Sequence, residues 1–161
     1  MKNFSWRYTF LQVSDLPAKA QCFIDIMNLD VSGLKLMRLE ADPNGGFIKG
    51  FPDEPDNTSA VYSRFDDTIY FIKPVKVGVV IHELTHFYLD TLNDFISEEY
   101  TAHSKAISKS FIDKYGHEAL SNYASVSLLN DKWDEVVCEI VAVYGRRGQF
   151  GKIKGLLEPC H

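Results

Sequence analysis

The segment from Val75 to Leu92 constrains the fold of this 161-residue chain more than any other. Apolar residues lie on nearly every side of the helix that it would form, a pattern typical of a helix buried in a protein core. They are Val75, Val77, Val79, Val80, Ile81, Leu84, Phe87, Leu89 and Leu92. The same segment holds His82, Glu83 and His86, and burying such groups costs free energy unless a partner satisfies them. We therefore expect these residues to share a partner, and a metal ion is a suitable one.

The spacing of these polar residues is that of the His-Glu-x-x-His pattern. Residues four apart lie on one face of a helix, so His82 and His86 can bind one ion at the usual Zn–N distance of about 2.0–2.1 Å. Glu83 lies about 100° round the helix, where it can deprotonate a metal-bound water without being a ligand. We predict one Zn²⁺ per chain, although such ligands also suit iron. The structural alternative is a pair of hydrogen-bonded core histidines, with Glu83 facing solvent.

A catalytic zinc ion needs a third protein ligand, and the sequence leaves more than one candidate open. Asp90 is on the same helix as His86 but too far along its axis. Glu99 shares a helix face with His103, in an arrangement similar to the Glu-x-x-Ala-Asp helix of several zinc peptidases; its alternative is the solvated face of an amphipathic helix. Glu135 and Glu139 lie four apart on a mostly apolar segment, so one can bind the metal while the other orients a ligand histidine. Their alternative is stabilisation of a helix start, which suits Glu135 better than Glu139.

These motifs resemble those of the zincin metallopeptidases that use a glutamate ligand, and in particular the lethal-factor-type catalytic domain. That family has HExxH on one helix, then a tyrosine-bearing segment, then Glu-x-x-Ala-Glu on another helix. The matching stretches here are residues 82–86, 121–125 and 135–139, within a likeness that covers roughly residues 60 to 145. This chain departs from the family pattern in having Cys138 in place of alanine and a longer gap after the tyrosine.

The resemblance implies a role for each matched residue. His82, His86 and Glu135 would bind zinc, and Glu83 would be the general base. Tyr123 would donate a hydrogen bond to the oxyanion of the tetrahedral intermediate. An edge strand before the active-site helix, from residues 60–63 or 68–72, would pair with the substrate backbone.

The local patterns along the chain predict an α+β fold, with a small mixed sheet followed by a mostly helical half that carries the HExxH helix. We expect one zincin-like domain over residues 1–161, with a sheet-rich half to about residue 74, a helical half to about 145 and a flexible tail over 146–161. The predicted elements are a helix over 17–28, strands over 34–39 and 46–51, a loop over 52–59, a hairpin over 60–64 and 68–72, helices over 76–92, 95–115 and 133–144, a short helical piece over 117–123 and a loop over 125–132.

Composition excludes several classes of protein. A net charge of −5 argues against a nucleic-acid binder that works through a general positive surface. The chain contains no apolar run long enough for a membrane helix and no visible secretory signal, so we expect no membrane association and take the cytoplasm as the default location, with secretion by another route left open. The three cysteines indicate free thiols and not a disulfide framework.

The predicted function is hydrolysis of peptide bonds in a peptide or protein substrate by a metal-bound water that Glu83 activates. The alternative is a binding protein of the same fold, directed at a host or partner protein, with little or no catalytic activity. The sequence indicates neither the substrate nor the oligomeric state.

Overall fold

The computed structural model of the chain describes residues 7–40, 60–72 and 75–158. Within these ranges it contains a mixture of strands and helices, so the predicted α+β class is confirmed. In chain order the elements are β1 (Arg7–Leu11), the 3₁₀ helix η1 (Val13–Asp15), α1 (Ala18–Ile26), β2 (Lys35–Glu40), β3 (Ala60–Ser63), β4 (Thr68–Phe71), α2 (Val77–Leu92), α3 (Ser97–Tyr115), the 3₁₀ helix η2 (His117–Ala119), α4 (Asn122–Leu129), α5 (Trp133–Arg146) and α6 (Phe150–Leu157).

The described strands form a mixed sheet in the order β1-β2-β4-β3. β2 and β4 are parallel, whereas β1 and β3 are antiparallel to their neighbours. The predicted hairpin is confirmed as β3 and β4, and the predicted strand over 34–39 as β2. β1 was not predicted, and its Thr9 and Phe10 are both exposed. The predicted strand over 46–51 and the loop over 52–59 lie outside the described residues.

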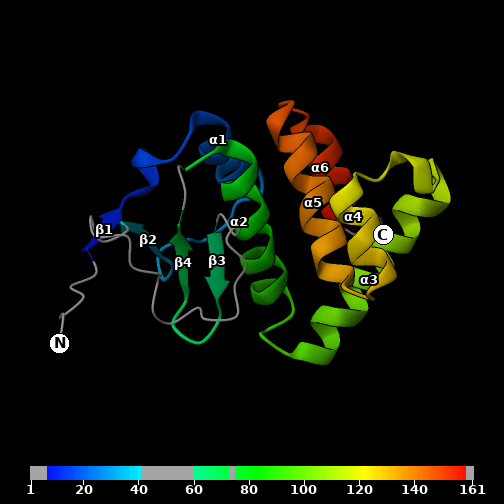
Figure 1. Ribbon diagram of the computed structural model, residues 1–161, viewed down its shortest axis with the longest axis horizontal. Coiled ribbons are helices and arrows are strands. Elements are labelled where there is room, and N and C mark those ends of the chain that lie inside the picture. The colour runs from blue at the N-terminus through cyan, green and yellow to red at the C-terminus, as the bar shows by residue number, and fades with distance from the viewer. Residues whose placement is uncertain (1–6, 41–59, 73–74, 159–161) are drawn as a thin grey trace.

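Helix α2 lies between the sheet on one side and the group of α3, α4, α5 and α6 on the other (Figure 1). It packs against β3 and, over a longer contact, against α5. Val80, Ile81, Leu84 and Leu89 are fully buried. This position explains why the helix is apolar on nearly every side, and it confirms the predicted buried helix over 76–92.

The other long helices also match their predictions. α1 corresponds to the helix predicted over 17–28, α3 to 95–115 and α5 to 133–144. Ala20, Phe23 and Ile24 of α1 are buried together with Met27, as their helical spacing predicts.

Helix α4 corrects the prediction of a loop over 125–132 and shifts the short helical piece predicted over 117–123. Residues 117–119 form only a 3₁₀ turn, and the helix starts again at Asn122. Ser121 is its N-cap: the Ala124 N–H donates to Ser121 Oγ at 3.2 Å. The sequence pattern places Ser121 inside the short helical piece and not before its start, and Val126 and Leu129 lie on the exposed side and show no core-facing pattern.

Helix α6 corrects the prediction of a flexible tail over 146–161. Ile153 and Leu157 lie four apart on this helix and are fully buried in the main core. Gly151 and Gly155 are exposed and leave the buried face intact. Residues 159–161, with Cys160, lie outside the described part of the chain.

Helices α2 and α5 approach each other closely at Gly145, near the end of α5. A Cβ atom at this position would overlap Ile81 Cδ1 and lie 3.3 Å from Ile81 Cγ2. The absence of a side chain therefore lets the two helices that carry the predicted metal ligands pack against each other.

Among the described helices, none combines the length and the apolar content needed to cross a lipid bilayer.

Candidate metal centre

The HExxH residues lie in the middle of α2, on the side that faces a cavity of about 940 Å³. β3, α2 and α5 contribute most of its lining. His82, Glu83 and His86 all line this cavity, and Glu83 and His86 are buried. Helical spacing thus brings His82, Glu83 and His86 together on α2, and α5 lies opposite them.

Glu135 of α5 meets both histidines of α2. His82 Nε2 lies 2.9 Å from Glu135 Oε2, and His86 Nε2 lies 3.1 Å from Glu135 Oε1. The same nitrogen of each ring thus points at one carboxylate from another helix. Among the candidates for a third ligand, the structure brings Glu135 to the histidines. Glu99 is exposed on α3 and does not line the cavity.

The other nitrogen of each histidine also has a partner. His82 Nδ1 lies 3.6 Å from Glu139 Oε2, so Glu139 is placed to orient this ring. His86 Nδ1 lies 2.8 Å from Tyr100 Oη, and the Tyr100 hydroxyl donates to Asp134 Oδ2 at 3.0 Å. Because Tyr100 gives its proton to Asp134, its oxygen accepts the Nδ1 proton of His86. This arrangement fixes both rings with Nε2 directed at Glu135, as is usual for metal-binding histidines.

The electrostatics of the site favour a cation between these groups. Burial opposes protonation of His82, but hydrogen bonds with Glu135 and Glu139 outweigh it and raise the pKa of His82 to about 10. The pKa of His86 is raised as well, because hydrogen bonding to Glu135 outweighs burial. The pKa of Glu135 is lowered, since hydrogen bonds from both histidines outweigh its own burial. A positive charge held by the histidine pair is therefore stabilised by an ionised Glu135, and a divalent cation can replace the two protons.

Glu83 differs from Glu135 in its environment. Burial raises the pKa of Glu83, although the two neighbouring histidines partly oppose this effect. A carboxylate with a raised pKa accepts a proton more readily near neutral pH than an ordinary one. Its place in the cavity, next to the histidines and without the paired contacts of Glu135, suits a proton acceptor.

Tyr123 of α4 lies at the same site, on its exposed side. Its hydroxyl donates to Glu135 Oε2 at 2.9 Å, and its ring centroid is 6.0 Å from that of His82. Its exposed fraction is 53%, so the phenol can also be reached from solvent. The long gap between Tyr123 and Glu135 in the sequence contains the rest of α4 and the turn into α5.

Asp90 lies further along the same face of α2 and forms an ion pair with Arg64. The Arg64 Nε–H donates to Asp90 Oδ2 at 3.3 Å, and a guanidinium Nη2 also contacts the other carboxylate oxygen. Arg64 Nη1 donates to Ser97 Oγ at 2.8 Å, which links the turn after β3 to the start of α3. This ion pair agrees with the expectation that Asp90 is not a metal ligand.

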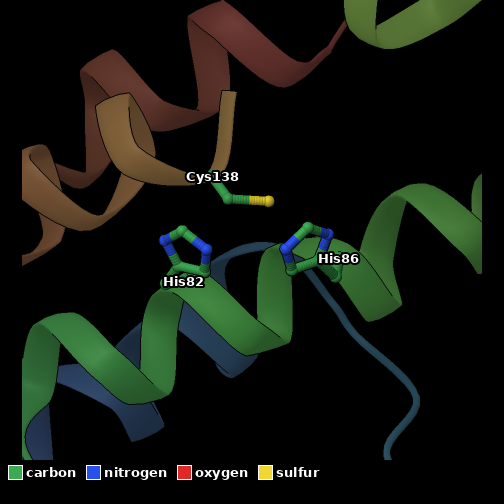
Figure 2. Close-up of side chains that lie close together, drawn as sticks. All are labelled: His82, His86 and Cys138. Atoms are coloured by element: carbon green, nitrogen blue, oxygen red, sulfur yellow. The ribbon is translucent and has the colours of Figure 1, made fainter. Parts of the chain in front are cut away.

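Three residues of the site were not predicted from the sequence: Tyr100, Asp134 and Cys138. The sequence gives no signal for Tyr100 beyond its place on an amphipathic helix, and none for Asp134 beyond its place at a helix start. The sequence does give a signal for Cys138, which stands where the family pattern has alanine. It is fully buried, and Figure 2 shows its side chain projecting from α5 toward the two imidazole rings on α2.

Two overlapping groups of side chains have the proximity that a metal ion requires. One ring nitrogen of His82, one of His86 and the Sγ of Cys138 all lie within 4.8 Å of one another. The same holds for one atom each of His86, Asp134 and Glu135. Imidazole, carboxylate and thiol are the donors that zinc prefers, so the residues present fit this ion.

Comparisons with known proteins identify no relative. No protein-family model, no curated protein and no solved structure matches this chain. The geometry of the site is therefore the basis for assigning a function.

Proposed function

We propose that this chain is a zinc-dependent metallopeptidase of the zincin type. The observation that carries the proposal is the convergence of His82 Nε2 and His86 Nε2, from one helix, on the carboxylate of Glu135, from another. Two imidazoles and a carboxylate are the three protein ligands of one common class of catalytic zinc site. Glu83 in the same cavity supplies the base that such a site needs.

The chain's own residues would each do a separate part of the chemistry. A bound zinc ion would polarise the scissile carbonyl and acidify a water molecule. Glu83 would accept the proton of the attacking water and pass it to the leaving amine. Glu139 and the pair of Tyr100 and Asp134 would hold the two imidazole rings in place through their Nδ1 atoms. Tyr123 would donate its hydroxyl proton to the carbonyl oxygen as negative charge develops there.

Strand β3 supplies the surface for an extended substrate. In the described sheet, β3 is one of the two outer strands and β4 lies between β2 and β3. Of the two strands predicted as a substrate edge, only β3 thus has a side without a neighbour among the described strands. Ala60, Val61 and Tyr62 of β3 also line the cavity, so a peptide paired with this edge would pass alongside Glu83 and the histidines.

The decisive experiment is the substitution Glu83→Gln, which keeps the size of the side chain and removes the base. We expect metal content to stay at one zinc per chain and cleavage of casein and of a quenched peptide library to fall by about 10²–10⁴-fold. Glu98→Gln, on the exposed first turn of α3, is the matched control and should retain full activity.

Two outcomes would contradict the proposal. Full peptidase activity of Glu83→Gln would exclude Glu83 as the base. A wild-type protein that binds zinc stoichiometrically and cleaves no member of the library would instead favour the alternative, a binding protein that retains the metal site.

A further inference from the structure

Cys138 lies on the turn of α5 that carries the other groups of the site. It follows Glu135 by three residues, so the two side chains share the α5 face that packs on α2. Its thiol is fully buried and points toward the rings of His82 and His86 (Figure 2). A buried cysteine directed at two histidines is a different environment from that of Cys22, which is exposed on α1.

The distances suit a shared metal ion. In a four-coordinate site with Zn–S near 2.3 Å and Zn–N near 2.0–2.1 Å, the ligand atoms lie about 3.5 Å from one another. Cys138 Sγ and one nitrogen of each histidine already lie within 4.8 Å of one another. An ion held by the two histidines would therefore lie next to Cys138 Sγ.

A thiolate at this position requires the charge of the ion. Burial and the carboxylates of Glu135, Asp134, Glu83 and Glu139 raise the pKa of the Cys138 thiol, so the thiol is protonated when no metal ion is bound. A zinc ion bound by two neutral imidazoles and the carboxylate of Glu135 would carry one remaining positive charge, which favours loss of the thiol proton as the ion binds. The sulfur–metal bond forms as the thiol proton leaves to solvent, so metal uptake releases one further proton.

We infer that Cys138 Sγ is a fourth ligand of the metal ion and that the resting site is the closed set His82, His86, Glu135 and Cys138. The inference rests on the metal site of the proposed function and adds regulation to it. Zinc prefers four ligands, and a catalytic site must keep one position open. The sulfur-bound form is therefore latent, and the site becomes catalytic when Cys138 leaves the ion. A thiolate also selects borderline-soft ions such as Zn²⁺ and Co²⁺ over Mg²⁺ and Ca²⁺.

Cobalt spectroscopy tests the inference without relying on activity. Metal-free full-length protein is titrated with Co²⁺ alone, and its visible d–d bands and near-ultraviolet sulfur-to-cobalt charge-transfer band are recorded. We expect one Co²⁺ per chain and both kinds of band in the wild type. Cys138→Ala, which restores the alanine of the family pattern, should retain the visible bands and lose the near-ultraviolet band. Cys22→Ala and Cys160→Ala are the controls for the other two thiols and should behave as the wild type.

The results separate this inference from the proposed function. A near-ultraviolet band that is absent from the wild type, or unchanged in Cys138→Ala, with the visible bands present, would overturn the cysteine ligand alone. Failure of the wild type to bind Co²⁺ or Zn²⁺ would overturn both. If Cys138→Ala does not fold, X-ray absorption of the zinc-loaded wild type decides: a sulfur neighbour near 2.3 Å supports the inference, and only lighter neighbours at about 2.0–2.2 Å refute it.

Discussion

Glu135 is the residue on which the geometry of the site depends. It contacts both HExxH histidines and accepts a hydrogen bond from Tyr123, so three side chains from two other helices meet at one carboxylate. Removing it would leave the buried His86 and the partly buried His82, whose pKa values are raised by its presence, without this partner. Substitution of Glu135 therefore distinguishes a metal site with Glu135 as the third ligand from one with Glu99 as the third ligand.

We expect Glu135→Ala to lower zinc affinity at least 10–100-fold, the range seen even for the residues that orient metal ligands. Glu99→Ala should leave the zinc content unchanged, because Glu99 is exposed on α3. Elemental analysis of the two variants after dialysis against low zinc measures the difference. Loss of zinc in Glu99→Ala alone would show that the third ligand comes from α3.

His82 makes the stability of the metal-free protein depend on pH. Burial opposes its protonation, yet hydrogen bonds with Glu135 and Glu139 raise its pKa to about 10, against about 6.5 in an unfolded chain. Because the folded value is the higher one, the stabilisation is complete below pH ~6.5 and is lost as the pH rises toward 10.

We expect the urea midpoint of the chelator-treated protein to fall between pH 6.5 and 9.5, and to fall less in His82→Gln. His117→Gln, on the exposed 3₁₀ turn η2, should follow the wild-type curve. Parallel curves for the wild type and His82→Gln would contradict the charge network around this histidine.

For individual residues, the prediction of the site from the sequence depended on helical spacing. His82, Glu83 and His86 could be placed on one face because positions on a single helix have fixed relations. The choice among Glu99, Glu135 and Glu139 could not be made, because it depends on how α3 and α5 pack against α2. Tyr100 and Asp134 act through contacts with residues far away in the sequence, and nothing in their local sequence marks them.

At the scale of elements, the contact between α2 and α5 is the one that assembles the site. Gly145 sits where a Cβ atom would overlap Ile81 Cδ1, and Ile81 is itself fully buried. A side chain at this position would displace Ile81 or push apart the two helices that carry the histidines and Glu135.

We expect Gly145→Ala to lower the free energy of unfolding by about 1–3 kcal/mol and to weaken zinc binding as well. Gly151→Ala on α6 is the matched control, since a Cβ there meets no atom within 4 Å. That change should be neutral or stabilising by up to about 1 kcal/mol, because alanine favours the helix. Urea denaturation of both variants measures the effect, and equal stability of the two would contradict the close packing at Gly145.

The elements that could be predicted are those with a strong periodic pattern. α2 and α5 have long apolar faces, whereas α4 exposes Val126 and Leu129, the latter at 84%, and so lacks a recognisable core face. α6 buries only Ile153 and Leu157 among its glycines and lysines, and two positions are too few to distinguish a helix from a tail.

At the scale of the whole molecule, a metal ion at this site would connect the two sides of the fold. α2 packs on the sheet, and α5 belongs to the helical group on its other side (Figure 1). A ligand that binds only where both meet stabilises the folded chain as a whole.

We expect zinc at 100 times its dissociation constant to stabilise the protein by about 2.7 kcal/mol. For a chain of this size, that raises the unfolding midpoint by roughly 5–10 °C. Differential scanning fluorimetry with zinc, with magnesium and with chelator measures the shift, and magnesium should give none. The double variant His82→Ala/His86→Ala should show no zinc shift; an equal shift in that variant would place the stabilising ion elsewhere.

The fold class could be predicted, but the topology could not. Strand β2 pairs with β1 and with β4, and both pairings depend on contacts between distant parts of the chain. A local pattern indicates that a strand exists and does not identify its neighbours.

The order of the helices along the chain has a consequence for synthesis. His82 and Glu135 are 53 residues apart, so at 5–20 residues per second the ribosome needs about 3–11 s between them. During that interval α2 has been made, whereas the helix that covers its apolar side has not. The newly made chain must keep Val80 and Leu84 from associating with other apolar surfaces until α5 emerges. The side chains of the proposed metal site are complete only at that moment, so an ion could be held by both helices only after α5 has been made.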